Sequence, residues 1–187
     1  LFSTAAGLES MVIGEREIAG QMRRAARTAW EDGTLSCDLG RAAERASATS
    51  RRVATETGLA GTGRSVVAVG LDMAAAHLRP WKDARVLIVG TGAYAGATVS
   101  ALHALGASDV SVYSTSGRAR EFAQGRGIGW VSAANLPSAL ERADLVVTCR
   151  GLGSPVLTRD MAAQAGHTVV LDLALMRDTE SSVASLP

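Results

Sequence analysis

The hydrophobic positions of this chain repeat with one period near the N-terminus and with another further along. In the N-terminal third, apolar residues such as Ile18, Met22 and Trp30 recur every three to four residues, which is typical of amphipathic helices. Asp32-Gly33 supplies a stop and a turn, and a second helix is predicted over residues 37–56. The pattern therefore predicts a helical N-terminal region.

From residue 85 onward, short runs of apolar, β-branched residues alternate with segments of helical pattern. Strands are predicted at residues 85–89, 109–113, 128–131, 145–148 and 168–172. Helices are predicted before and between them, at residues 66–78, 92–105, 117–124, 137–142 and 158–165. Because strands that alternate with helices form parallel sheets with right-handed crossovers, we predict an α/β fold with a doubly wound, Rossmann-type parallel sheet. The expected strand order is 3-2-1-4-5, with helix 66–78 packed on the sheet.

The candidate domain boundary is Gly61-Thr62-Gly63, where two glycines interrupt the pattern. It divides the chain into a helical domain, residues 1–61, and an α/β domain, residues 62–187.

Composition narrows the class of protein. The chain has 187 residues, of which 47% are hydrophobic and 20% charged, so it can bury a core and is not a disordered segment. A net charge of +1 gives no global field that would attract nucleic acid or a membrane, and no apolar run reaches the roughly 18 residues that a membrane span needs.

The histidines and cysteines do not have the spacing of metal ligands, so no metal site is predicted. Two cysteines, Cys37 and Cys149, cannot build a disulfide framework, which favours a reducing compartment and a cytoplasmic location. We interpret both thiols as structural.

A glycine loop follows the first predicted strand and opens the next helix, in the pattern G-x-G-x-x-A. Gly90 permits a tight turn, Gly92 lets the backbone approach a pyrophosphate, and Ala95 is small enough for close packing of helix on strand. The N–H groups of the helix start would hold the phosphates. The predicted dinucleotide-binding residues are Gly90, Thr91, Gly92, Ala93, Tyr94 and Ala95. The alternative is a tight turn that binds nothing.

The end of the second predicted strand distinguishes the two nicotinamide cofactors. An NAD site places Asp or Glu there, whereas this chain has Ser114, Ser116 and Arg118. Hydroxyls and an arginine suit the 2′-phosphate of NADP, so we predict NADPH as the cofactor. The alternative is a serine that caps a helix beside a solvated Arg118. The loops at residues 149–154 and 172–174 follow later strands and are expected near the nicotinamide half.

The polar cluster at the N-terminus has a simpler explanation from the residues alone. Glu17 and Gln21 are four residues apart and would share one helix face. On physical grounds a solvated helix face and an N-terminal cap are favoured.

Several segments of the chain resemble the glutamyl-tRNA reductase family. Residues 1–23 resemble the long signature of that family, and the resemblance continues through residues 52–58, the glycine loop, residues 143–147 and residues 171–178. It implies the end of a catalytic domain followed by an NADPH-binding domain. The family uses NADPH to reduce glutamate esterified to its tRNA to glutamate-1-semialdehyde, which opens tetrapyrrole, or porphyrin, synthesis. The reaction passes through a cysteinyl thioester.

The resemblance also assigns roles to residues. The substrate-binding positions fall on Ser10, Glu15, Arg16, Glu17 and Gln21. The nucleophilic cysteine and a functional histidine are expected upstream of Leu1, and Cys37 does not match the nucleophile, so this chain alone is expected to be inactive. Two departures stand out. Glu17 replaces a usual Gln or Arg, and Ser114-Thr115-Ser116 replaces a usual Asn-Arg-Ser/Thr, with the arginine moved to Arg118.

The implied partners are glutamyl-tRNA as the substrate, the aminomutase that acts next, and a second copy in a homodimer whose dimerisation domain is expected after Pro187. No membrane partner is expected. Two alternatives stay open. One is an NADP oxidoreductase similar to shikimate dehydrogenase, a family that lacks the signature at residues 7–23. The other is a nucleotide-binding domain without chemistry.

Overall fold

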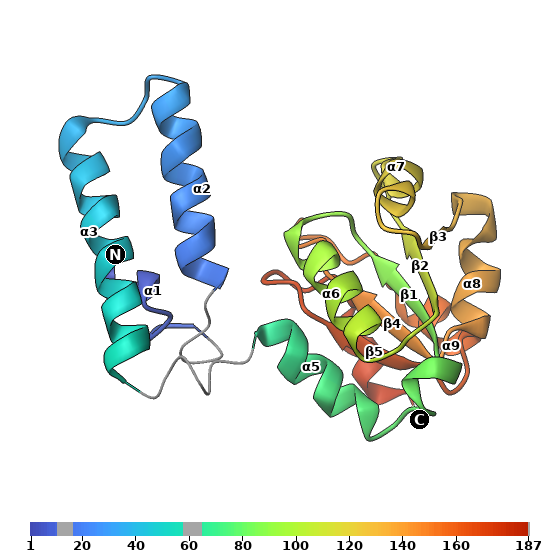
Figure 1. Cartoon of the computed structure of the whole chain (residues 1–187). Helices are drawn as coiled ribbons and strands as arrows, with labels where there is room; N and C mark the ends of the chain where they lie inside the picture. Colours follow the sequence, from blue (N-terminus) through green and yellow to red (C-terminus); the bar gives the residue numbers. More distant parts are fainter. Residues whose placement is uncertain (11–16, 58–64, 187) are drawn as a thin grey trace. The chain divides into compact units, whose positions relative to one another are not determined.

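The computed structural model describes residues 1–10, 17–57 and 65–186 (Figure 1). The chain forms two compact units, Leu1–Val66 and Val67–Pro187. The predicted boundary at Gly61-Thr62-Gly63 lies outside the described residues. No helix of the described part is long and apolar enough to cross a membrane.

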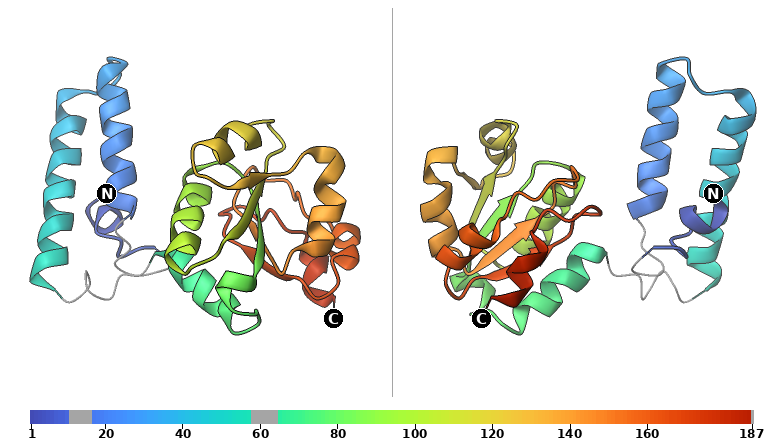
Figure 2. Two further views of the ribbon diagram at one scale, coloured as in Figure 1. Left: turned by 45° about the vertical axis from the view of Figure 1, so that its right-hand side comes forward. Right: turned by 180° about the vertical axis from the view of Figure 1, so that it is seen from behind.

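The first unit consists of helices. The long helices α2 (Glu17–Glu31) and α3 (Cys37–Glu56) run antiparallel, and both contact the short helix α1 (Phe2–Ala5) (Figures 1 and 2). The turn between α2 and α3 contains Gly33 at φ +67°, a left-handed conformation that favours glycine. The Ser36 hydroxyl then accepts the Leu39 N–H at 3.3 Å and caps α3. The helix predicted at 37–56 is confirmed, whereas α1 gave no periodic signal because it has only four residues.

The second unit is a three-layer α/β domain. Its five strands are β1 (Arg85–Val89), β2 (Asp109–Tyr113), β3 (Gly129–Trp130), β4 (Leu145–Thr148) and β5 (Val169–Asp172). All neighbouring strands pair in parallel, in the order β3-β2-β1-β4-β5. The predicted fold class and strand order are therefore confirmed.

The helices of this unit are α5 (Val66–Ala75), α6 (Ala93–Ala104), α7 (Ala119–Gln124), α8 (Leu136–Arg142) and α9 (Arg159–Gln164). Most of these helices are one to three residues shorter than predicted at one end or at both. Three 3-10 helices, at Trp81–Asp83, Ala133–Asn135 and Ser181–Ser185, were not predicted, because single turns lack a period that can be recognised in the sequence.

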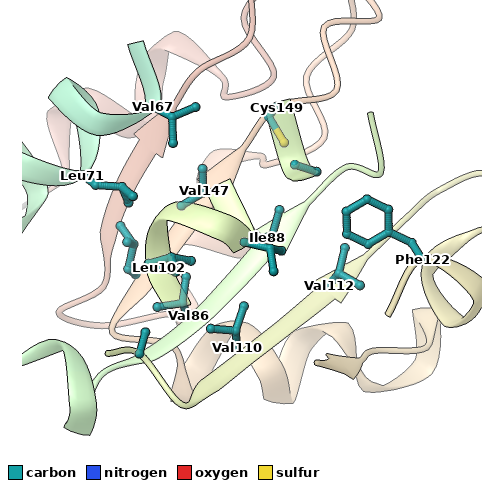
Figure 3. Packing of buried hydrophobic residues seen from close by; sticks show 14 of the residues in the cluster. Val67, Leu71, Val86, Ile88, Leu102, Val110, Val112, Phe122, Val147 and Cys149 are labelled. Atoms are coloured by element: carbon teal, nitrogen blue, oxygen red, sulfur yellow. The ribbon is translucent and has the colours of Figure 1, made fainter. Parts of the chain in front are cut away.

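The side chains of the central strand alternate between two cores. Val86 and Ile88 point to the face covered by α5, α6 and α7, and Leu87 and Val89 point to the face covered by α8 and α9. Figure 3 shows the first core, with Val67 and Leu71 of α5 lying against the sheet. Burial of a strand on both faces explains why β1 reads as a continuous apolar run.

The packing of α5 on the sheet gives a stability prediction. Replacing Leu71, 1% exposed, by Ala should lower the free energy of unfolding by about 2–5 kcal/mol, because it removes buried methyl groups and leaves a cavity. The matched control on the same helix is Met73→Ala, where the side chain is 70% exposed and the change should be about 0.5 kcal/mol or less. Urea unfolding followed by tryptophan fluorescence measures both, and equal effects would contradict this packing.

Candidate cofactor site

The carboxyl ends of four strands meet at one edge of the sheet. The strand register pairs Val89 with Tyr113 on one side and with Thr148 on the other, and it pairs Thr148 with Asp172. The loops that follow β1, β2, β4 and β5 therefore start side by side. In open α/β sheets this edge is where ligands bind.

The glycine loop fills the centre of this edge. Gly90 has φ +134° and donates its N–H to the Tyr113 carbonyl at 2.9 Å. A Cβ on Gly90 would lie 3.1 Å from the Cys149 sulfur and 3.2 Å from its carbonyl carbon. Both the conformation and the close approach of the β4 backbone therefore require glycine at this position.

Gly92 is different, because no residue that the structure describes crowds it. A Cβ there would meet no atom within 4 Å among the described residues, and the residue is exposed at the start of α6, where no side chain caps the helix. The exposed Gly92 thus lies at the positive end of the α6 dipole, and a helix start of this kind can accept a phosphate. Ala95, fully buried, packs α6 on the sheet as predicted.

The other predicted residues of the loop lie around this helix start. Thr91 and Tyr94 are half-buried, and Ala93 is exposed. The chain thus brings the whole predicted glycine loop to the carboxyl end of β1.

The turn after β2 gathers the three residues predicted to select the cofactor. The Ser114 and Ser116 hydroxyls lie 2.9 Å apart, and Arg118 Nε donates to the Ser116 hydroxyl at 3.0 Å. Gly117, at φ +77°, closes the turn by donating its N–H to the Ser114 carbonyl. Neither serine caps α7, whose N-cap residue is Arg118 itself and has no side-chain cap. The hydroxyls are therefore not used as helix caps.

A small pocket adjoins this turn. It has a volume of about 280 Å³ and is lined by Thr91, Arg118, Glu121, Phe122 and Arg126. The Arg126 guanidinium lies 3.8 Å from the centre of the Phe122 ring. The pocket joins the glycine loop to the turn after β2, so one ligand could contact both.

Two aspartates hold the remaining loops of this edge. Asp178, fully buried, accepts the backbone N–H groups of Arg150 and Gly151 at the end of β4. Asp172 accepts the N–H groups of Ala174, Asp178 and Thr179. Sequence reasoning singled out the loops but missed Asp178, and the only available signal was its place in the segment 171–178 that carries the family resemblance.

Cys149 lies directly after β4, at this edge of the sheet, and its thiol is not a reactive nucleophile. Its thiol is buried and donates to the Val89 carbonyl at 3.6 Å. Burial, followed by the negative charges of Asp178 and Asp172, raises the pKa of Cys149 to about 12. A neutral thiol is a poor nucleophile, which supports the structural interpretation of this residue.

The residues predicted to bind substrate belong to the first unit. The Ser10 hydroxyl donates to the Gly7 carbonyl at 3.0 Å, and Gln21 is exposed on α2. Glu17 is the first residue of the same helix. Glu15 and Arg16 lie outside the described residues.

No cluster of three or more histidine, cysteine, aspartate or glutamate residues in the described part of the chain could hold a metal ion.

Comparisons with known proteins show to which family this chain is similar. Residues 1–57 match the family described as the N-terminal domain of glutamyl-tRNA(Glu) reductase, and residues 72–187 match shikimate/quinate 5-dehydrogenase. A glutamyl-tRNA reductase of Cutibacterium acnes is 48% identical over 189 residues, covering 98% of this chain. The chain belongs to the glutamyl-tRNA reductase family. The resemblance found at residues 1–23 is thereby confirmed.

Other members of the family agree over the same span. A glutamyl-tRNA reductase of Kocuria rhizophila is 46% identical and covers the whole chain, and the solved glutamyl-tRNA reductase of Methanopyrus kandleri is 30% identical over 99% of it, with a TM-score of 0.61. The chain spans 42% of the Cutibacterium protein, 43% of the Kocuria protein and 48% of the Methanopyrus chain.

The match to shikimate/quinate 5-dehydrogenase covers the second unit only, starting at residue 72. It reflects the nucleotide-binding domain, which the predicted alternative shares with the glutamyl-tRNA reductase family. The match of residues 1–57 separates the two, because it falls on the segment that the shikimate family was expected to lack.

The two cysteines should differ sharply in alkylation. At pH 8, a pKa of about 12 leaves only about one Cys149 thiol in ten thousand ionised, and the side chain is also buried, whereas Cys37 is exposed. Iodoacetamide should therefore modify Cys37 alone in the native chain and both thiols in denaturant. Mass spectrometry of tryptic peptides measures this, and rapid native modification of Cys149 would contradict its burial.

Proposed function

We propose that this chain supplies the NADPH-binding domain, and part of the substrate domain, of an NADPH-dependent glutamyl-tRNA reductase. The whole protein would reduce glutamyl-tRNA to glutamate-1-semialdehyde at the first step of tetrapyrrole, or porphyrin, biosynthesis. One observation carries the proposal: in a member of this family, the open glycine loop at the start of α6 lies beside a turn after β2 that carries hydroxyls and an arginine but no carboxylate.

The glycine loop would hold the pyrophosphate. Open space at Gly92 would let a phosphate approach the backbone at the start of α6, where the helix dipole favours an anion. Gly90 keeps the turn tight enough to aim the helix start at that space. NADPH, when bound, supplies the hydride for reduction; the residues of this chain bind and orient it.

The turn after β2 would select NADPH over NADH. A carboxylate there would accept the ribose 2′-OH of NADH and repel the 2′-phosphate of NADPH. Ser114, Ser116 and Arg118 instead offer hydroxyl and guanidinium donors in one hydrogen-bonded group. Charge-assisted hydrogen bonds of this kind favour a phosphate.

The first unit would contribute to binding of the glutamyl group. Its candidate residues are Ser10, Glu15, Arg16, Glu17 and Gln21, which combine carboxylate, hydroxyl, amide and guanidinium groups. Such groups could hold the ammonium and carboxylate of a glutamyl ester.

The thioester chemistry would need a thiolate that this chain does not supply. Cys149 is buried and neutral, and Cys37 does not match the family's nucleophile. The nucleophile and the functional histidine would come from an upstream segment of the whole protein. The substrate of the whole protein would be glutamyl-tRNA, and the aminomutase that acts next would be a partner. The whole protein would form a homodimer and would be located in the cytoplasm.

Cofactor preference is tested by calorimetry with NADPH and NADH. We expect NADPH to bind at least about tenfold more tightly, because a charge-assisted contact to the phosphate contributes about 1.5–3 kcal/mol. Arg118→Ala should reduce that preference, and Arg120→Ala, which removes an exposed arginine lying over Trp130 instead, should keep it. Equal dissociation constants for the two cofactors in the unmodified chain would count against NADPH.

Activity is tested by a single-turnover assay with glutamyl-tRNA and NADPH. The 187-residue chain should form no aldehyde, because Cys149 is buried with a raised pKa and Cys37 does not match the family's nucleophile. Cys149→Ser provides the control. If the chain forms aldehyde and Cys149→Ser abolishes it, the nucleophile belongs to this chain and its assignment to an upstream segment is wrong.

A further inference from the structure

An arginine that the cofactor proposal does not use connects two loops of the site. Arg150 follows β4, and its Nη1 donates to the Thr115 hydroxyl, which follows β2, at 3.3 Å. Because β1 lies between β2 and β4 in the sheet, this side chain passes over the carboxyl end of the strand that carries the glycine loop. The loop after β4 was expected near the nicotinamide half, whereas Arg150 reaches the turn that would face the adenosine ribose.

The side chain of Arg150 is held in place rather than solvated. It is 14% exposed, and its Nε lies 3.7 Å from Oδ1 of the fully buried Asp178. Its Nη2 donates to the carbonyl of Ser154 in its own loop. Among the described residues, Nε has an ion-pair partner but no hydrogen-bond partner. The guanidinium is therefore fixed with its Nη1 edge toward the turn after β2.

Two guanidinium groups consequently approach the same turn. Arg118 contacts the hydroxyl of Ser116, and Arg150 contacts the hydroxyl of Thr115. With Ser114, the turn presents three hydroxyls and two arginines, and residues 114–118 contain no carboxylate. Guanidinium groups with several directed donors are the preferred partners of phosphate oxygens.

The position of Arg150 also relates to one difference between this chain and the usual family pattern. Thr115 stands where the resembled family usually has the arginine of Asn-Arg-Ser/Thr, so position 115 itself carries no guanidinium, although Arg118 lies three residues further along. Arg150 brings another one to the side chain of this same residue, from a loop 35 positions further along the chain.

We propose that Arg150 is a specificity-determining residue that binds the 2′-phosphate of the cofactor, in place of the arginine missing at Thr115. This inference rests on the proposal that the cofactor is NADPH. The simpler alternative is a purely structural role, in which Arg150 only ties the loop after β4 to Asp178. The two roles differ in one measurable property, the discrimination between ligands with and without the 2′-phosphate.

The test uses adenosine 2′,5′-bisphosphate and 5′-AMP as probes, which differ only in that phosphate. Binding of each to the 187-residue chain is measured by calorimetry. Arg150→Gln should weaken binding of the bisphosphate about tenfold or more and leave AMP within about twofold, because only the phosphate contact is lost. Arg159→Gln is the matched control: it removes an exposed arginine that also donates a hydrogen bond to another segment of the chain, at the Ser182 carbonyl, and it should change neither affinity.

A second variant separates loss of the contact from damage to the fold. Thr115→Arg introduced into the Arg150→Gln background returns a guanidinium to the turn from β2. It should restore most of the bisphosphate preference, whereas a guanidinium at position 115 would not restore AMP affinity that was lost through a structural role of Arg150. Thermal unfolding of each variant shows that the folded domain is being compared.

Each result bears on one proposal or on both. If Arg150→Gln keeps the bisphosphate preference, or weakens both probes equally without rescue by Thr115→Arg, the inference is wrong while the NADPH proposal stands. If the unmodified chain shows no preference for the bisphosphate, both fail. A selective loss that Thr115→Arg restores supports the role of Arg150.

Discussion

The close approach of β1 and β4 at their carboxyl ends is the constraint on which the site depends. A Cβ on Gly90 would lie 3.1–3.3 Å from the sulfur and backbone atoms of Cys149, so the two strands can meet there only across a glycine. The same residue turns the chain from β1 toward α6, with φ +134°. Gly90 therefore determines both how closely β1 and β4 pack and the direction in which the chain leaves β1 toward α6.

One buried and one half-buried carboxylate give the surrounding loops their shape. Asp178 accepts backbone N–H groups of the loop after β4, and Asp172 accepts those of the loop after β5. Burial is the main reason that the pKa of Cys149 is raised, and the charges of Asp178 and Asp172 add to it. Asp178 also pairs with the guanidinium of Arg150 and helps to orient it.

Most of the fold could be predicted from the sequence. β1, β2, β4 and α3 were predicted with bounds that match or nearly match, because β-branched runs and long amphipathic periods are local signals. The glycine loop and the turn at Ser114, Ser116 and Arg118 were also recognised, since their chemistry lies in consecutive residues. The single-turn helices and the exact ends of α5 and α7 were missed, because helix ends depend on contacts as well as on propensity.

By itself, the sequence determined the alternation of strands and helices, the strand order, the family and the absence of a carboxylate after β2. Each of these follows from neighbouring residues or from a contiguous motif. Only the tertiary structure decided that Asp178 holds the backbone at Arg150 and Gly151, and that Arg150 reaches Thr115. These partners are 27 to 35 residues apart. They meet because parallel strands bring their carboxyl ends to one edge of the sheet, and no local periodicity in the sequence encodes which side chains will face each other there.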